Sequence, residues 1–138
     1  RCQGRSKEAR GCSLGACPSL PTPGGSCPAH PGWFPGALKC YIQQDNLRMT
    51  WREVAMHCSR LLPGARMLSI NSQEEQDEVS SHVLRSGSWA WFNATDTRTE
   101  TVWRQGSTPL TYTNWNFMTG EPNGGSGENC ASIQAKRG

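Results

Sequence analysis

The sequence has no long apolar run and no strong excess of charge of either sign. No stretch approaches the roughly 18 apolar residues of a spanning helix, so we expect no membrane insertion within these 138 residues. A formal net charge of +3 is too small to indicate nucleic acid as a partner. A signal peptide is also missing, and the chain starts at Arg1, so we expect a mature product or a fragment.

Residue patterns typical of zinc sites and of enzymes are missing as well. There is no Cys-x-x-Cys pair, and the three histidines are scattered, which disfavours zinc. His57 precedes Cys58, but Cys58 falls on a predicted buried stripe, which does not suit a nucleophile. Glu121 and Glu128 match a glycosidase pair only in residue type. We therefore expect no enzyme.

Cysteine, in contrast, is abundant. Seven cysteines in 138 residues indicate an oxidising, extracellular compartment, and the odd number leaves at least one without a partner in the chain. Cys27 and Cys40 flank two short aromatic segments and the turn Pro35-Gly36. Two cysteines in such positions can face each other across a hairpin. A disulfide between them stabilises the fold by about 3 kcal/mol, because it lowers the conformational entropy of the unfolded chain. We predict this one disulfide within the chain.

Residues 1–18 contain almost no apolar side chains, so any order there depends on disulfides. The spacing of Cys2, Cys12 and Cys17 resembles the last third of a thrombospondin type 1 repeat, and a basic linker is the alternative. Repeats of this type often bind sulfated glycans, so a local basic patch could take such a partner, although the default for such a cluster is a solvated surface. The patch consists of Arg1, Arg5, Lys7 and Arg10.

The segment 19–26 contains two prolines and two glycines without periodicity, which is typical of a linker. We therefore place a domain boundary there, with residues 1–18 before it and a second domain at 27–138.

The second domain begins with two helical signals. Thr50 with Glu53 forms a capping box, and apolar residues then recur at helical spacing until Pro63-Gly64. Ser72 with Glu75 forms a second capping box, which opens a helix that ends at Gly87. We interpret the acidic run 74–78 as a solvated helix face.

Segments of strand type at 67–70 and 89–92 accompany these helices, followed by an aromatic, turn-rich half without helical period. This order predicts an α+β fold.

Near the end of the chain, hard oxygen ligands gather on a loop. Glu121, Asn123, Glu128 and Asn129 lie within nine residues, separated mostly by glycine and serine. Ca²⁺ takes six to eight oxygen ligands, so this loop predicts a calcium site, with an ordinary polar turn as the alternative. Pro122 follows Glu121 directly, so its cis or trans state sets where the neighbouring ligands point.

Several motifs of the second domain stand in the order of a C-type lectin-like domain, which 27–138 resembles. They are Cys40-Tyr41, Thr50-Trp51, Cys58, Leu68-Ser69-Ile70, Glu74-Glu75-Gln76, Trp91-Phe92, Trp115 to Asn123 and Glu128-Asn129-Cys130. The resemblance implies a double-looped fold with two helices and small antiparallel sheets. The pair Cys27 and Cys40 marks the longer variant, which has an extra N-terminal hairpin.

In sugar-binding members of that family, residues matching Glu121, Asn123 and Glu128 hold the principal Ca²⁺ beside a cis proline. The ion and its ligands then bind two vicinal sugar hydroxyls. Glu-Pro-Asn resembles the mannose type, which favours glycans with equatorial 3- and 4-hydroxyls such as mannose, N-acetylglucosamine, glucose or fucose. Binding of one such sugar is expected to be weak, with avidity from multiple copies.

The resemblance also implies an auxiliary Ca²⁺ at Asp96 and Glu100 with help from Glu128. Two further acidic positions of the family read Gly124 and Asn129 here, which disfavours a strong auxiliary ion.

The family continues with a Trp-Asn-Asp segment and two cysteines, which this sequence does not contain after Cys130. We therefore expect a domain that is truncated at its C-terminus, with half a calcium site, unpaired Cys58 and Cys130, and poor stability. The loop before Gly120 is longer than usual. Its Phe117 and Met118 could flank a bound sugar, but we expect them to pack inward.

The sequence thus predicts a calcium-dependent carbohydrate-binding module in an extracellular protein, either secreted or the ectodomain of a membrane protein. The alternative is a protein-interaction or matrix module that uses the same fold without calcium. Asn93 opens the one glycosylation sequon, and its use stays open because it follows an expected core strand.

Overall fold

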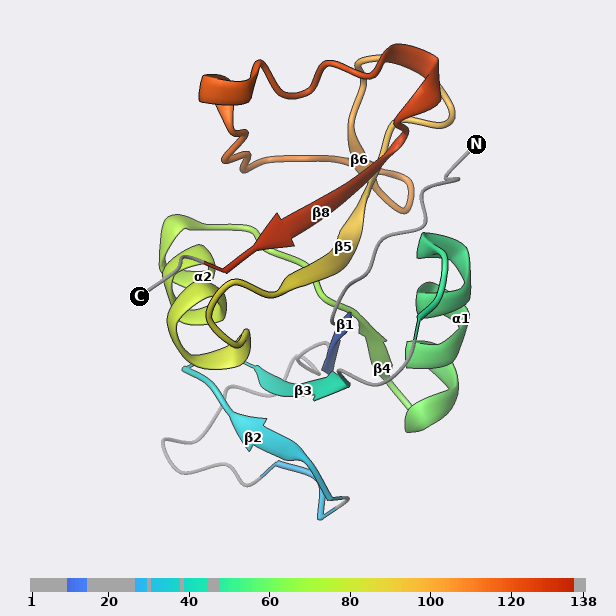
Figure 1. The fold of residues 1–138 in the computed structure, drawn as a ribbon. Coiled ribbons are helices and arrows are strands. Elements are labelled where there is room, and N and C mark those ends of the chain that lie inside the picture. Colours follow the sequence, from blue (N-terminus) through green and yellow to red (C-terminus); the bar gives the residue numbers. More distant parts are fainter. Residues whose placement is uncertain (1–9, 15–26, 30, 38, 45–47, 136–138) are drawn as a thin grey trace.

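Two small antiparallel sheets and two helices build the domain (Figure 1). The computed structural model describes residues 10–14, 27–29, 31–37, 39–44 and 48–135. Helices α1 (Trp51–Leu61) and α2 (Gln73–Glu78) lie on either side of the central strands in Figure 1. Within the described ranges, no helix has the length and apolar character needed to cross a membrane. This architecture is the expected α+β fold.

The first sheet has the strand order β2-β3-β1-β4. Its strands are β1 (Arg10–Leu14), β2 (Trp33–Pro35), β3 (Cys40–Gln44) and β4 (Ala65–Met67), and each neighbouring pair is antiparallel. Strand β1 therefore lies between β3 and β4, which differs from the boundary expected at 19–26. Backbone pairing needs no apolar sequence, so the composition of this segment did not reveal it. Residues 1–9 and 15–26 lie outside the described residues, and the thrombospondin resemblance stays a prediction.

The second sheet has the strand order β7-β6-β5-β8 and carries the long loops of the domain. Its strands are β5 (Trp89–Thr95), β6 (Arg104–Gln105), β7 (Thr108–Pro109) and β8 (Cys130–Gln134). Strands β5 and β8 pair over Trp89↔Gln134 to Thr95↔Cys130, with an irregularity between Trp91 and Thr95.

Helix α1 begins and ends where its sequence signals predict. The Glu53 side chain accepts from Thr50 N at 2.6 Å, and Glu53 N donates to Thr50 Oγ1 at 3.4 Å, which completes the capping box. The helix ends one residue before Leu62, which is extended, and Gly64 then adopts a positive φ of 84°. The expected buried stripe is confirmed at Cys58, whose side chain is inaccessible to solvent.

Helix α2 starts at the predicted cap but continues differently. Ser72 Oγ accepts from Glu75 N at 3.2 Å, and the chain passes into a π-helical turn, η1 (Val79–Val83), before Gly87. The Glu75 carboxylate is 5% exposed; it accepts from Asn71 N at 2.6 Å and pairs with Lys39 Nζ at 2.6 Å. The acidic run is therefore not a purely solvated face, because the partner of Glu75 comes from a distant hairpin.

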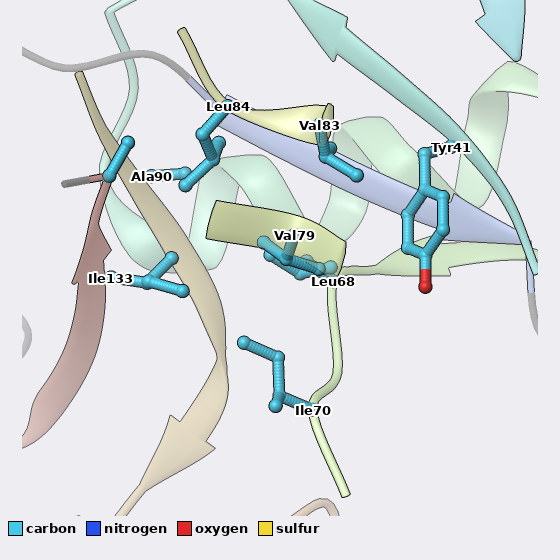
Figure 2. Close-up of a cluster of buried hydrophobic side chains, with 9 residues drawn as sticks. Tyr41, Leu68, Ile70, Val79, Val83, Leu84, Ala90 and Ile133 are labelled. Atoms are coloured by element: carbon cyan, nitrogen blue, oxygen red, sulfur yellow. The ribbon is translucent and has the colours of Figure 1, made fainter. Parts of the chain in front are cut away.

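The apolar core forms two clusters of buried side chains, and strand β5 contributes a residue to each of them. The cluster in Figure 2 joins the segment after β4, the π-helical turn and the second sheet, through Tyr41, Leu68, Ile70, Val79, Val83, Leu84, Ala90, Ile133 and Ala135. The other cluster packs α1 against the sheets through Ile42, Val54, Cys58, Met67 and Trp91. Together they fix both ends of the β5–β8 pair, from which the long loops emerge.

One of the predictions about disulfides is confirmed and another is wrong. Cys27 and Cys40 are bonded, with their Cα atoms 5.6 Å apart, as predicted. Cys58 and Cys130 are disulfide-bonded too, so the prediction that they lack partners is wrong. That prediction took their partners from the resemblance alone, and did not consider the three cysteines that precede Cys27 in the sequence. With these thiols bonded, that argument for poor stability no longer applies.

A buried hydroxyl links the first sheet to α2 and makes stability sensitive to alkaline pH. Tyr41 donates from its hydroxyl to Glu78 Oε2 at 3.0 Å, and Glu78 Oε1 accepts from Ala37 N at 2.6 Å. Burial, the hydrogen bond to Glu78 and the nearby charges of Glu78 and Glu75 raise the pKa of Tyr41 far above its usual value. The folded protein therefore keeps this proton at a pH where the unfolded chain loses it.

We expect Tyr41→Phe to lower the free energy of unfolding by about 1 kcal/mol at neutral pH. The stabilisation that the raised Tyr41 pKa provides is complete below about pH 10 and is lost as the pH rises above that value. The wild type therefore loses stability above about pH 10, and its difference from the variant shrinks. Urea unfolding at pH 7 to 11 measures this. Tyr112→Phe is the comparison: burial and the charges of Asp77 and Glu74 also raise the Tyr112 pKa, but its hydroxyl bonds Gln73 in an exposed hydrogen bond, so we expect a smaller pH-dependent loss. A constant difference across this pH range would contradict the account.

Candidate metal and ligand site

The candidate site lies where the long segment between β7 and β8, drawn orange to red at the top of Figure 1, meets the segment between β5 and β6. This segment contains two 3₁₀ turns, η2 (Phe117–Thr119) and η3 (Gly125–Gly127). The Asn116 carbonyl accepts from Thr119 N, Thr119 Oγ1 and Glu121 N, each at 3.1 Å. Gly120 ends η2 in the left-handed conformation, with φ of 81°. The backbone before the candidate ligands is therefore closed into one hydrogen-bonded unit.

The side chains of Glu121 and Asn123 contact each other. Asn123 Nδ2 donates to Glu121 Oε1 at 3.2 Å and to Thr119 O at 3.1 Å, and the Glu121–Pro122 peptide is cis, as the resemblance implies. These two bonds use both hydrogens of the Asn123 amide and leave its oxygen as the atom that can face a cation. The pair thus presents a carboxylate and an amide oxygen from one short turn.

Glu128 lies on the other side of the loop, after η3. Its backbone N donates to Gly125 O at 3.1 Å, and its exposed side chain lies directly against Gly124. A Cβ at position 124 would collide with Glu128 Cβ and Cγ, so only glycine leaves this carboxylate its present place. The sequence had suggested that Gly124 is merely a lost acidic ligand; the structure gives it a steric role.

Asn129 is buried and joins the loop to the sheet. Its carbonyl accepts from Asp96 N at 3.2 Å and from Thr95 Oγ1 at 2.5 Å, while its Nδ2 donates to Ser126 O at 3.0 Å. The amide of Asn129 therefore supports η3, and is not aimed at solvent as a ligand would be.

Asp96 supplies the clearest sign of an ion site. Its side chain is 4% exposed; Oδ2 accepts from Thr101 N at 2.9 Å, but Oδ1 has no hydrogen-bond partner. Thr101 has a positive φ of 68°, which is uncommon for a β-branched residue. A cavity of about 20 Å³ adjoins this carboxylate, lined by Asp96, Glu100, Thr101, Trp103, Pro122, Gly124, Gly125 and Glu128. An unpaired buried carboxylate oxygen beside a cavity of that size fits one small cation.

The structure thus brings the predicted site residues into two sets. Asp96, Glu100 and Glu128 line the cavity, whereas Glu121 and Asn123 form the adjoining pair. Pro122 lines the cavity between the sets. Among the residues that the structure describes, no three His, Cys, Asp or Glu side chains already stand together as a metal cluster. The ligands of the expected principal ion are therefore near one loop but not gathered around one point.

Two features of the loop were missed by the sequence reasoning. Trp103 and Trp115 pack against each other at a tilt of 55°, with ring centroids 4.8 Å apart, which supports the segment beside the cavity. Phe117 and Met118 were expected to pack inward, but their side chains are 75% and 99% exposed. The extra length of the loop before Gly120 was the one signal available, because a longer turn carries its side chains away from the sheet.

Asn93 lies inside β5 and is half-buried, with its backbone N donating to Leu68 O at 2.6 Å. The hydroxyl of the sequon residue Thr95 already donates to Asn129 O. Glycosylation of Asn93 stays a prediction.

Comparison with known proteins agrees with this geometry. Residues 47–138, which are 92 of 138, match the Lectin C-type domain, and the chain belongs to this family. A scavenger receptor C-type lectin carbohydrate-recognition domain of the mouse is similar in structure, with a TM-score of 0.66 and 27% identity. That likeness covers 79% of this chain and 82% of the mouse domain. The family is non-enzymatic, so the expectation of no enzyme is confirmed.

Individual relatives carry different names. The mouse low affinity immunoglobulin epsilon Fc receptor is 37% identical over 78% of this chain, and mouse asialoglycoprotein receptor 2 is 35% identical over 78%. A mannose-binding C-type lectin isoform of Oxyuranus scutellatus is 29% identical over 82% of this chain and 73% of its own length. The matches span only 30% and 35% of the two mouse receptors, which is about a third of their length.

The contact between Gly124 and Glu128 gives a test of the site. We expect Gly124→Ala to weaken calcium binding about tenfold, equivalent to about 1.4 kcal/mol, because the new methyl group displaces the Glu128 side chain. Gly127→Ala is the matched control, since nothing lies within 4 Å of its added Cβ. Calorimetric calcium titration of both variants measures the effect, and equal affinities would remove Glu128 from the site.

Proposed function

We propose that the chain is a calcium-dependent carbohydrate-recognition domain of the mannose type. The observation that carries this proposal is the pairing of Glu121 with Asn123 beside the cis peptide, next to a cavity that holds the unpaired Asp96 Oδ1. Both features supply oxygen atoms to a small cation, which is the chemistry of Ca²⁺. Membership of the lectin family supports it, since the motif lies within the matched residues 47–138.

Glu121, Asn123 and Glu128 are the residues we assign to the principal ion. A bound Ca²⁺ would offer open coordination positions to two adjacent sugar hydroxyls. The carboxylates of Glu121 and Glu128 accept hydrogen bonds from those hydroxyls, and the Asn123 amide can donate to one of them by giving up its hydrogen bond to Glu121 or to Thr119. The hydroxyl that meets both Glu121 and Asn123 is then recognised as donor and as acceptor, which orients the sugar.

Asp96 and Glu100, with Glu128, are assigned to an auxiliary ion at the cavity. The buried Asp96 Oδ1 has no other partner, and a cation there would remove the cost of an unsatisfied carboxylate oxygen. Such an ion would also hold Glu128 near Pro122 and thereby stabilise the loop that carries the sugar ligands.

The sugar class follows from the order of the ligands. Glu121-Pro122-Asn123 resembles the pattern that selects equatorial 3- and 4-hydroxyls, as in mannose, N-acetylglucosamine, glucose and fucose. The name of the snake mannose-binding isoform supports this choice, while the name asialoglycoprotein receptor points to a different glycan. An extracellular location, secreted or on an ectodomain, is supported by the disulfides and by the receptor names of the mouse relatives. The basic residues proposed for sulfated glycans precede Gly11 and lie in a segment whose side chains the structure does not describe.

A second candidate function is a protein-interaction or matrix module that works without calcium. It is favoured by the immunoglobulin epsilon Fc receptor among the relatives, and by the lack of a ready three-carboxylate cluster within the described residues.

Retention on immobilised mannose separates the two functions. We expect the chain to bind a mannose column in millimolar calcium and to elute with a chelator, because the ion is part of the sugar site. Calorimetry of the same protein should give two ions per chain if both assigned sites fill. Flow-through in calcium, with the protein folded by circular dichroism, would support the module that works without calcium.

Exchanging the ligand order tests the sugar class. We expect the double variant Glu121→Gln and Asn123→Asp to bind mannose about tenfold more weakly and to gain affinity for galactose, since the donor and acceptor positions are reversed. A glycan array in calcium measures the change, with the chelator-treated protein as control. An unaltered mannose preference would show that these two residues do not select the sugar.

A further inference from the structure

We propose that Phe117 and Met118 form an apolar subsite beside the sugar site, which selects glycans that carry an apolar substituent such as an acyl or alkyl chain. This inference rests on the proposed sugar-binding function and names a finer class of ligand for the same site. It starts from the two most exposed large apolar side chains in the described part of the protein, Phe117 at 75% and Met118 at 99%.

The turn directs both side chains outward, and the rest of the described protein covers little of either. The other large aromatic residues of the segment, Tyr112 and Trp115, are half-buried and contact the core or a neighbouring ring. Phe117 and Met118 are adjacent, so they expose a continuous apolar surface on η2. Scattered single apolar residues on a surface are ordinary, but an adjacent pair beside a candidate binding site offers a contact for a ligand.

The turn that carries this pair is bonded to the proposed sugar ligands. The Asn116 carbonyl accepts from Thr119 N and from Glu121 N, so it ties η2 to the first ligand residue. Thr119 O accepts from Asn123 Nδ2, which ties η2 to the second. The apolar pair and the pair of ligands therefore belong to a single hydrogen-bonded unit, 116–123, which holds the apolar surface within a few residues of the proposed sugar ligands.

Size and charge favour part of a glycan as the occupant over a membrane or a second copy of the chain. Two side chains supply far less than the roughly 1,000 Å² that a stable protein interface needs. The segment 110–129 contains Glu121 and Glu128 but no Lys or Arg, so it lacks the basic residues that attract an anionic membrane surface. A short alkyl or acyl group on a sugar matches the small apolar area, and the neighbouring site already holds the sugar.

Matched mannosides test the subsite. Methyl α-mannoside is compared with hexyl α-mannoside and with methyl 6-O-hexanoyl-α-mannoside, so that apolar chains leave the sugar in two directions. We expect at least one apolar derivative to bind about five- to tenfold more tightly than methyl α-mannoside, from burial of its chain against Phe117 and Met118. Competition for the mannose column in calcium measures all three ligands.

The double variant Phe117→Ala and Met118→Ala should lose this advantage and keep its affinity for methyl α-mannoside. Replacing both residues by Leu should retain most of the advantage, since an apolar surface remains. Met56→Ala is the control, because Met56 is 45% exposed on α1, away from the loop, and should behave as the wild type.

Several results would overturn the subsite. Equal binding of the three mannosides by the wild type would do so, as would an advantage that survives in the alanine variant. Binding of the apolar derivatives that persists after chelation would show a patch that acts without the sugar site. Sedimentation that shows a dimer lost in the alanine variant would assign the patch to a second copy. If methyl α-mannoside itself fails to compete in calcium, the proposed sugar binding is wrong, and the proposed subsite is then wrong as well.

Discussion

The carbonyl of Asn129 accepts two hydrogen bonds that hold the two halves of the site in place. Asp96 N and Thr95 Oγ1 both donate to it, so the last residue before β8 is fastened to the end of β5. This junction fixes where the long loop returns to the sheet, and thereby where η3 and Glu128 lie relative to the buried Asp96 carboxylate. Without it, the cavity would lose the wall that Gly124, Gly125 and Glu128 provide.

Local parts of the fold could be predicted because their causes are local in sequence. The capping box at Thr50, the stop at Gly64 and the hairpin disulfide Cys27–Cys40 depend on residues no more than 13 positions apart, and all three are confirmed. The partner of Glu75 could not be predicted in this way, because Lys39 lies 36 positions earlier. The pairing of β1 with β3 and β4 escaped prediction for the same reason: a backbone pairing between distant segments leaves no mark in composition.

The candidate site likewise has features that the sequence reveals and features that depend on the fold. Its residue types were readable from the sequence, because Glu121, Asn123, Glu128, Asp96 and Glu100 are oxygen-bearing residues in a recognisable order. Their arrangement was not, because it depends on three-dimensional contacts of residues without ligand chemistry. Gly124 is the instructive case, since an absent side chain reads as a missing ligand, whereas in the fold it provides the space that the Glu128 side chain occupies. The outward direction of Phe117 and Met118 similarly follows from the turn at 116–121.

The hydrogen bonds of the loop determine what a cation would have to change. Asn123 Nδ2 donates to Glu121 Oε1 and Thr119 O, and neither bond uses the Asn123 amide oxygen or the second oxygen of Glu121. An ion can therefore take those oxygens while both hydrogen bonds stay, so these two ligands need little reorganisation. Glu128 differs, because its side chain is exposed and its position depends on the glycine turn of η3. The ordering that calcium requires is thus concentrated at 124–128, where a second cation beside Asp96 would act on the same carboxylate, and filling of the two sites would be coupled through Glu128.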